Sequence, residues 1–436
     1  MKRVGFAAAW LCAAVSLWGQ QNDAGSNGAP PTSVPELIER LRDEEADSEL
    51  RRRAAYALGK FGPLAKSATP ELLAVLNHQS LPLGLYALDA IGRIGPDAAE
   101  SVPDVLAAMN RRNEMIAKDS NWDDPHFWLT AMRTFGRIGP GAKSAAPVVE
   151  KFLKSEDPLQ RVAAAASLWK IERRPQSIGT LIEIIGGSAD EAAYEAIMAL
   201  VDCGTDAETV VPPLVAALGH QAADVRRAAA KGLGSLGLPA VAAVAEARRE
   251  NKDLDLHAAA VALGYVARRI RAATRDRPNA TADEVSATAT ALAEQAVPVL
   301  VQALHDPQPR TRTAGVRALS WLGVSATPQL LETLRSDSEV ARQSAEETLI
   351  RVGDFLPPKT LSPEALDWLR KSVAPSLIAG ASDEDLLVRT AAARMLAIFP
   401  LGEHGRDALP ALREALKDPD VALRGHALKA LELYQR

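Results

Sequence analysis

The 436-residue chain carries 50 Lys and Arg residues against 55 Asp and Glu residues, which gives a formal net charge of −5. Loss of Lys2 and Arg3 with an N-terminal leader would make that charge −7, so we expect no bulk attraction to nucleic acid. Of the two cysteines, only Cys203 would remain in the exported chain, which excludes an intramolecular disulfide. We expect Cys203 to be a small buried side chain rather than a nucleophile.

Residues 1–19 have the pattern of an export signal. Lys2 and Arg3 precede an apolar run, Val4–Trp18, that is short for a membrane span. Residues 20–34 are polar and rich in Gly, Asn and Pro, which is typical of a flexible linker. We therefore predict an exported bacterial protein, periplasmic or extracellular, with no membrane span after the signal. A lipid anchor at Cys12 and an uncleaved leader are the alternatives.

From Pro35 onward, one small residue recurs at steps of 30 to 35 residues, with three longer steps. It is Ala54, Ala87, Ala131, Ala164, Ala196, Ala229, Ala259, Gly315, Ala345, Ala392 and Ala427. A large apolar residue follows four positions later each time: Leu58, Ile91, Phe135, Leu168, Leu200, Leu233, Leu263, Leu319, Leu349, Leu396 and Leu431. Residues four apart share one face of a helix, so eleven copies of this pair predict a helical solenoid.

Each repeat is predicted to contain two helices, an A helix and a B helix. The A helix should begin near a proline, which loses no hydrogen bond in a first turn: Pro35, Pro70, Pro103, Pro147, Pro212, Pro298, Pro328, Pro375 and Pro410. The B helix holds the recurring Ala and Leu and often ends at a glycine suited to a left-handed cap: Gly62, Gly95, Gly139, Gly204, Gly237, Gly323 and Gly353. The long steps predict insertions near 111–125, 268–296 and 354–372, the second extending a helix before it loops.

The repeated unit resembles that of HEAT repeats, in the bacterial form called PBS-lyase-like HEAT repeats. The connectors "GPLAKSATP", "GPDAAESVP" and "GPGAKSAAP" at 62–70, 95–103 and 139–147 are part of this pattern. The resemblance covers Pro35–Tyr434. It implies an all-α fold at 35–436, an α-solenoid of about eleven stacked HEAT-type helix pairs in a right-handed superhelix.

An arginine stands three residues before the recurring small residue in seven repeats: Arg51, Arg161, Arg226, Arg312, Arg342, Arg389 and Arg424. An acid often stands six residues before that arginine: Glu45, Asp306, Asp383 and Asp418. In similar HEAT proteins such pairs form a ladder that joins successive repeats, so we expect a structural role. A substrate-binding row of arginines is the alternative. Gly84 and Trp128 replace the arginine in two repeats, where the ladder should be interrupted.

A basic stripe is predicted on the N-terminal repeats. The position two residues after the buried Leu lies about 200° around the helix and should face outward. Its first four occupants are Lys60, Arg93, Arg137 and Lys170, and later ones include the aromatic Tyr265 and Trp321. The basic stripe is a candidate binding site for an acidic partner or an anionic polymer. Ordinary solvated residues near helix ends, where cations suit the helix dipole, are the alternative.

The first insertion contains "DSNWDDPHFW" at 119–128. Trp122, His126 and Trp128 form a candidate partner-contact loop. Asp119, Asp123, Asp124 and His126 could also bind a cation, but their spacing matches no metal motif. Asp-Pro is ordinary turn chemistry, so we predict no metal site.

No P-loop, GxSxG, CxxC or dinucleotide-binding motif occurs, and we predict no catalytic residue and no cofactor. The leading interpretation is a monomeric, non-catalytic scaffold for protein–protein interaction in the bacterial cell envelope, with a protein partner and without nucleic acid. One alternative is a lyase-type enzyme or enzyme subunit, because similar repeats occur in lyases that attach bilin chromophores to phycobiliproteins. The other is a binder of an anionic surface polymer.

Overall fold

The computed structural model describes residues 33–76, 81–118, 125–187, 189–204, 206–251, 254–275, 288, 291–352, 363–399 and 401–434. All regular elements at these residues are helical. The chain forms two compact units, residues 1–148 with 170–172 and residues 149–169 with 173–436. The predicted export signal and almost all of the predicted linker lie outside the described residues.

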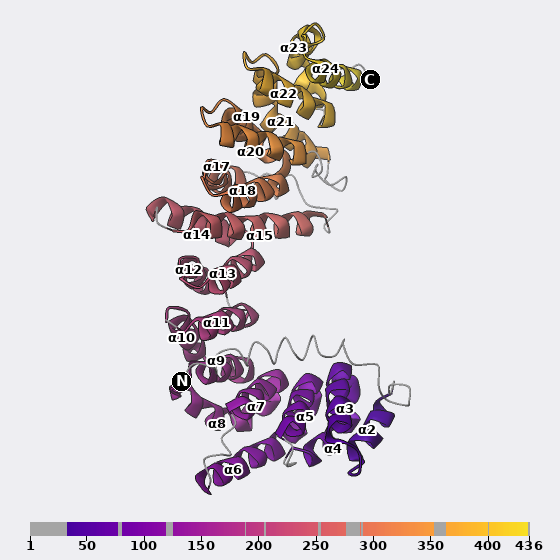
Figure 1. Ribbon diagram of the computed structural model, residues 1–436, viewed down its shortest axis with the longest axis vertical. Coiled ribbons are helices and arrows are strands. Elements are labelled where there is room, and N and C mark those ends of the chain that lie inside the picture. The colour runs from indigo at the N-terminus through magenta and orange to yellow at the C-terminus, as the bar shows by residue number, and fades with distance from the viewer. Residues whose placement is uncertain are drawn as a thin grey trace. The chain divides into compact units, whose positions relative to one another are not determined.

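The N-terminal unit consists of A and B helices that alternate along the chain (Figure 1). They are α2 (Val34–Arg42), α3 (Ser48–Phe61), α4 (Thr69–Ala74), α5 (Leu81–Ile94), α6 (Val102–Lys118) and α7 (Pro125–Ile138), and α8 (Ala146–Lys151) lies at the unit boundary. Three 3₁₀ helices connect them, Gly62–Ala68, Gly95–Ser101 and Gly139–Ala145. The B helices α3, α5 and α7 pack side by side in this order.

The C-terminal unit continues the alternation in chain order (Figure 1). Its A helices are α10 (Pro175–Ile185), α12 (Ala207–Ala217), α14 (Leu238–Glu250), α17 (Val297–Leu304), α19 (Thr327–Leu334), α21 (Pro363–Ala381) and α23 (Leu409–Ala415). Its B helices are α9 (Pro158–Glu172), whose last three residues belong to the N-terminal unit, α11 (Asp190–Asp202), α13 (Ala223–Leu236), α15 (Leu256–Arg275), α18 (Pro309–Leu322), α20 (Glu339–Val352), α22 (Leu386–Ile398) and α24 (Val421–Tyr434). From α11 to α24 each B helix packs against the next one. Short segments at Phe152–Lys154, Leu292–Ala296, Gly323–Ala326 and Gly402–Ala408 complete the unit.

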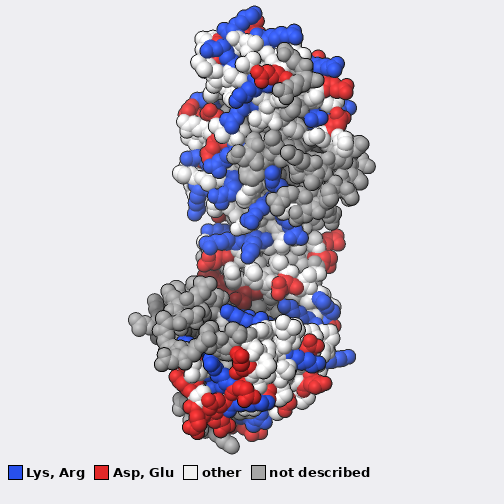
Figure 2. Space-filling view, turned by 90° about the vertical axis from the view of Figure 1, so that its right-hand side faces the viewer, with Lys and Arg blue, Asp and Glu red and all other residues white. Residues whose placement is uncertain are grey.

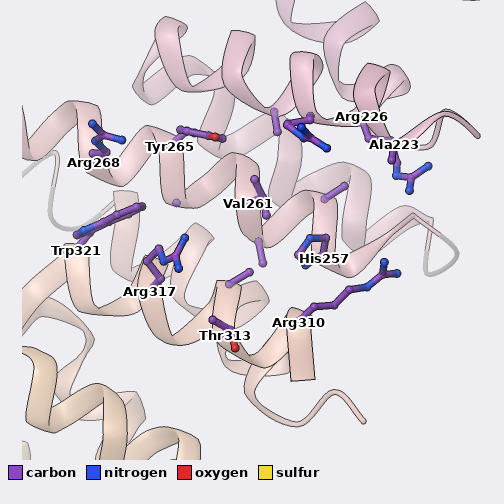
Figure 3. Close-up of a pocket in the computed structure, with 16 residues that line it drawn as sticks. Ala223, Arg226, His257, Val261, Tyr265, Arg268, Arg310, Thr313, Arg317 and Trp321 are labelled. Carbon is purple, nitrogen blue, oxygen red and sulfur yellow. The ribbon is translucent and has the colours of Figure 1, made fainter. Parts of the chain in front are cut away.

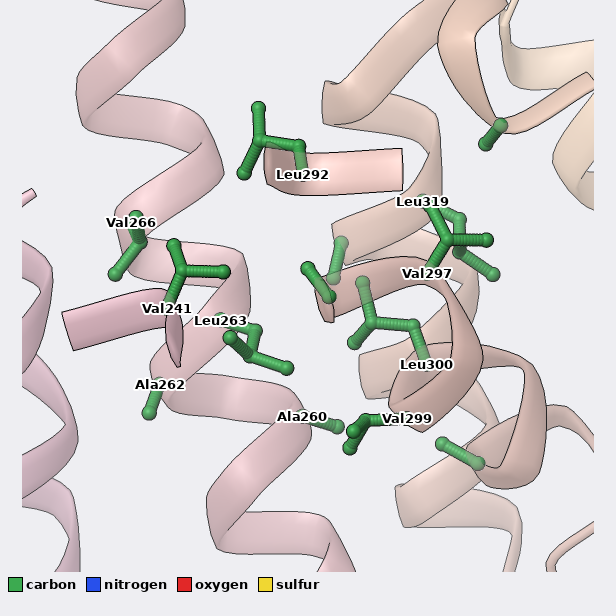
Figure 4. Close-up of a cluster of buried hydrophobic side chains, with 14 of the residues drawn as sticks. Val241, Ala260, Ala262, Leu263, Val266, Leu292, Val297, Val299, Leu300 and Leu319 are labelled. Carbon is green, nitrogen blue, oxygen red and sulfur yellow. The ribbon is translucent and has the colours of Figure 1, made fainter. Parts of the chain in front are cut away.

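The recurring small and large residues of the repeats form the core. Every recurring Ala and every large apolar residue four positions later is at most 5% exposed. Figure 4 shows such a cluster, in which Leu263 of α15 and Leu319 of α18 lie with Val297 and Leu300 of α17. Replacing one of these leucines by Ala should therefore destabilise the stack by about 2–5 kcal/mol. The predicted all-α arrangement of stacked helix pairs is confirmed within each unit.

Prolines and glycines mark most helix ends as predicted. Pro35, Pro70, Pro103, Pro147, Pro298, Pro328 and Pro410 lie in the first turn of an A helix. The prediction is wrong at Pro212 and Pro375, which lie inside α12 and α21. In α12 the Asp206 side chain accepts the backbone N–H of Thr209, so this cap starts the helix before the proline is reached. Six of the predicted B-helix glycines have positive φ, between 56° at Gly62 and 77° at Gly95, and the seventh, Gly353, lies outside the described residues.

Helices extend into all three predicted insertions. The A helix α6 continues to Lys118, and the B helix α15 continues to Arg275. The A helix α21 already begins at Pro363. The remaining parts of these insertions lie largely outside the described residues.

The arginines predicted to form a ladder chiefly hold the turn inside their own repeat. Arg312 Nη1 donates to the carbonyls of Asp306 at 2.9 Å and Pro307 at 2.8 Å, and four other ladder arginines make corresponding bonds. These bonds satisfy backbone carbonyls of the turn that joins the A helix to the B helix of the same repeat. The acid side chains have a second role in the same turn, since Asp306 accepts the backbone N–H of Gln308 at 2.7 Å. Asp383 and Asp418 accept from the chain in the same way.

Two ladder arginines also reach the next repeat. Arg389 Nη2 lies 3.1 Å from Asp418 Oδ2, and Arg226 Nε lies 3.3 Å from Asp255 Oδ2. In the second repeat, where Gly84 replaces the arginine, the side chain of Arg112 from α6 fills the space. A Cβ atom at Gly84 would lie 3.5 Å from Arg112 Nη2, and the guanidinium stacks on the Phe127 ring at 3.9 Å. At Gly84, where the ladder lacks its arginine, a cation from the following A helix therefore takes the place of the missing side chain.

Candidate functional site

The repeats of the N-terminal unit hold the basic stripe in register. A Cβ atom at Gly62 would lie 3.5 Å from the carbonyl oxygen of Arg93, and one at Gly95 would lie 3.8 Å from that of Arg137. A Cβ atom at Gly139 would likewise lie 3.8 Å from the carbonyl oxygen of Lys170. Each stripe residue therefore follows its predecessor at the spacing of one repeat.

The charges of the stripe have partners on the same surface. Asp89 lies between two of the cations, with Oδ2 2.6 Å from Arg93 Nε and Oδ1 2.6 Å from Arg137 Nη1. The ammonium of Lys60 lies 4.7 Å from the centre of the Tyr56 ring, in cation–π contact. The stripe is thus a bonded surface layer, which leaves less free charge for a ligand than its sequence indicates.

The residues predicted for a partner-contact loop do not form a loop where the structure describes them. His126 and Trp128 stand on α7, whereas Trp122, Asp119, Asp123 and Asp124 lie outside the described residues. Trp128 is only 6% exposed, and its ring meets that of Phe127 edge-on at 5.7 Å. Trp128 is therefore a core residue and not a contact for a partner. Cys203 is also buried, as expected.

A pocket of about 620 Å³ lies on three successive B helices of the C-terminal unit. The middle helix, α15, contributes His257, Val261 and Tyr265, and Arg268 ends this row (Figure 3). Helix α13 forms one wall with Arg226 and Arg227, and α18 forms the other. The wall of α18 is lined by Arg310, Thr313, Ala314, Arg317 and Trp321.

Glycines shape the pocket by letting these B helices approach one another. A Cβ atom at Gly234 of α13 would overlap the Cβ atom of Tyr265 on α15. A Cβ atom at Gly264 would lie 3.3 Å from Ala318 Cβ and 3.5 Å from Trp321 Cζ3. Because both positions lack a side chain, the two aromatic rings lie against the neighbouring helix as half-buried walls.

Among the described residues that line the pocket there are five arginines and no carboxylate. Arg226 is neutralised by Asp255, and Arg227 lies 3.2 Å from Asp224 on the exposed rim. Arg310 donates to the amide oxygen of Gln308, and within the described residues it pairs with no carboxylate. Arg268 and Arg317 are exposed and make no hydrogen bond or ion pair within the described part of the chain. Figure 2 shows Lys and Arg gathered at the level of α13 and α15 on the face of the B helices.

His257 contributes no positive charge at neutral pH. Burial lowers the pKa of His257, and Arg310 and Arg226 lower it further, against the opposing effect of the Asp255 carboxylate. The positive potential of the pocket therefore comes from its guanidinium groups. These groups donate up to five hydrogen bonds in a planar fork that fits carboxylates and phosphates.

Tyr265, Trp321 and the ladder arginine Arg226 are the residues of this pocket that the repeat pattern singles out. Tyr265 and Trp321 hold the same repeat position as the basic stripe, but Arg268, Arg310 and Arg317 hold other positions. A usable signal was present, because Arg268 follows Tyr265 by three residues and Arg317 precedes Trp321 by four. Residues at these spacings are neighbours on a helix surface.

Within the described residues, no group of His, Cys, Asp and Glu side chains is arranged to hold a metal ion. None of the helices searched combines the length and apolar character needed to cross a bilayer.

Comparison with known proteins identifies the repeats. The family model of HEAT repeats matches residues 178–264, 270–350 and 363–432, more than half of the chain. The model of the PBS lyase HEAT-like repeat matches residues 50–78. A search of curated proteins found no match.

Several solved structures are similar in fold. An engineered protein is 18% identical, with 93% of this chain and 100% of that chain covered and a TM-score of 0.29. Kap121p is 14% identical, with 92% and 49% covered and a TM-score of 0.44. A Kap95:Nup1 complex gives 14% identity, 92% and 63% coverage and a TM-score of 0.43. The chain spans about half the length of Kap121p.

Proposed function

Because this chain belongs to the HEAT repeat family, we propose that it is a non-catalytic scaffold that binds a protein partner in the bacterial cell envelope. The observation that carries the proposal is the pocket on α13, α15 and α18, where exposed arginines and two aromatic walls meet and no carboxylate is among the described lining residues. Exposed Arg and half-buried Tyr and Trp side chains are the residue types that most often anchor protein interfaces.

The chemistry of the pocket suits binding more than catalysis. A guanidinium stays protonated at every physiological pH, so it can orient and neutralise an anion but cannot act as a base. Among the described lining residues, the other titratable groups are His257 and Tyr265. The match to the PBS lyase HEAT-like repeat covers residues 50–78 of the N-terminal unit and does not include this pocket.

The envelope location rests on the N-terminal sequence. Lys2 and Arg3 followed by the apolar run Val4–Trp18 have the pattern of an export signal. Detection of the protein in the periplasmic fraction, with an N-terminus near Gln20, tests this part of the proposal. Recovery from the cytoplasm with residues 1–19 intact would contradict it.

Affinity capture tests the scaffold. The exported protein and the variant Arg268→Glu/Arg317→Glu are immobilised in parallel and exposed to an envelope extract of the source cell. We expect a defined protein that the wild type retains and the double variant loses. Arg269→Glu is the matched control, because Arg269 is exposed on the same helix but does not line the pocket. Equal retention by all three proteins would show that the pocket is not the interface.

A further inference from the structure

We propose that the pocket on α13, α15 and α18 binds a short extended acidic segment of a protein. In this segment, two carboxylates about three residues apart flank apolar side chains. The inference rests on the proposed scaffold function and names the chemistry that this scaffold recognises.

Uncompensated cations stand toward both ends of the pocket. Figure 3 shows Arg310 beside His257 at one end, and Arg268 near Trp321 at the other, with Arg317 between. Arg310 and Arg317 are seven residues apart on α18, which is two turns or about 10 Å along the helix. An extended chain covers this distance in about three residues. In the extended polyproline II conformation, which has three residues per turn and a rise of about 3.1 Å per residue, residues three apart lie on the same face about 9 Å apart. Acidic side chains at that spacing can each reach a guanidinium.

The pocket floor between these cations is apolar and is formed mainly by small side chains. Ala258, Val261 and Gly264 of α15 follow one another at three-residue spacing, and Ala230 and Ala314 flank them. Their small side chains leave the hollow open. Tyr265 and Trp321 form aromatic walls at one end. Apolar side chains between the two carboxylates would be buried on this floor. The ligand therefore needs both acidic and apolar side chains.

The neighbouring B helices limit the length of the ligand. Helix α11, which packs on α13, carries Asp190, Glu191, Glu195 and Asp202 and no Lys or Arg. Helix α20, which packs on α18, has Glu347 at the repeat position of Arg317, and Glu347 pairs with Arg351 at 2.7 Å. The positive charge of the pocket is therefore not continued at that position of α20. A nucleic acid or another long polyanion following the stacked B helices would meet the carboxylates of α11 on one side and this neutralised pair on the other. The positive surface accommodates a short acidic segment and is bounded beyond it.

The test measures fluorescence anisotropy with a defined probe. The probe is a fluorescein-labelled nonapeptide with two glutamates three positions apart and leucines between them. The same peptide with glutamines is the control ligand. We expect the glutamate peptide to bind the wild-type protein more than about tenfold more tightly than the glutamine peptide. Binding should weaken as salt is raised.

Variants assign the binding to the pocket. Arg268→Glu/Arg317→Glu should weaken binding of the glutamate peptide by more than about tenfold, and Arg269→Glu by less than about twofold. Arg317→Lys should give an intermediate loss, because an ammonium cannot make the bidentate contact. Circular dichroism melts should coincide for all these variants, since Arg268 and Arg317 have no partner among the described residues.

Three outcomes would overturn the inference. The first is equal binding of the glutamate and glutamine peptides. The second is tighter binding of a twelve-residue oligo-dT that the double variant abolishes, which would indicate a nucleic-acid site. The third is self-association of the wild type, lost in the double variant, which would make the occupant a second copy with its acidic segment 43–49.

The two proposals can fail separately. If the peptide does not bind but capture from the envelope extract still depends on Arg268 and Arg317, the scaffold stands and the acidic-segment inference is wrong. If the peptide does not bind and capture is also independent of the pocket, both are wrong.

Discussion

The basic stripe of the N-terminal unit and the pocket of the C-terminal unit are both built from equivalent B helices, but they treat charge differently. In the stripe, Asp89 neutralises Arg93 and Arg137, and Lys60 lies against Tyr56. In the pocket, Arg268, Arg310 and Arg317 have no carboxylate beside them in the part of the chain that the structure describes. Repeat register therefore aligns side chains, whereas their availability for a ligand depends on residues at other positions of neighbouring repeats.

Core truncation in each unit should have the largest effect on stability. Ile91→Ala in α5 and Leu263→Ala in α15 remove fully buried side chains, and each should cost about 2–5 kcal/mol. Because repeats contact mainly their neighbours, each loss should stay within its own unit. Hydrogen exchange measured by mass spectrometry should show faster exchange only in the mutated unit. Equal acceleration in both would show that the two units unfold as one.

Adding a side chain at Gly234, where α13 approaches α15, should have the next largest effect. Gly234→Ala places a Cβ atom against Tyr265, which should cost about 1–3 kcal/mol and displace α15. Binding of the glutamate peptide should fall with it. Gly179→Ala is the control, because nothing lies within 4 Å of a Cβ atom there. A stability change no larger than that of the control would contradict the close approach of α13 and α15.

Removing the shared carboxylate of the stripe should give a smaller effect. Asp89→Asn eliminates the ion pairs to Arg93 and Arg137, and exposed pairs of this kind contribute about 1 kcal/mol or less each. The stripe would then resemble the pocket in charge. We expect salt-sensitive binding of the glutamate peptide to appear at a second site in calorimetry. An unchanged stoichiometry of one peptide would show that uncompensated charge alone does not make a site.

The smallest effect should be a pH dependence from His257 in the pocket. Its pKa is lowered in the folded protein, chiefly by burial, so the unfolded chain binds more protons below the ordinary histidine pKa of about 6.5. The resulting loss of folding stability is absent above that pH and grows as the pH falls toward the lower pKa of His257 in the folded protein. Denaturant unfolding between pH 7.5 and 5.5 should show a small loss of stability, and His257→Gln should reduce it. An identical profile for the variant would rule out a contribution from His257.

Much of this fold could be predicted because its determinants are local. The recurring Ala and Leu set the helix face that is buried, and a proline or glycine marks most helix ends. Where other local chemistry competed, the prediction failed. Asp206 caps α12 before Pro212, and α21 passes through Pro375. Ladder arginines such as Arg312 bind the carbonyls of their own turn, a role that the spacing did not indicate, whereas Arg389 and Arg226 also pair with an acid of the next repeat.

The sequence by itself determined the repeat register, the buried face and the alignment of Lys60, Arg93, Arg137 and Lys170. Only the tertiary structure decided which cations are compensated. Asp89 pairs with Arg137 across 48 positions, and Arg112 fills the space beside Gly84 from another helix. The pocket likewise needs Gly234 and Gly264 to bring three B helices together around Arg268 and Arg317. Helix periodicity is a property of neighbouring residues, whereas charge pairing and cavity shape arise only when distant helices pack.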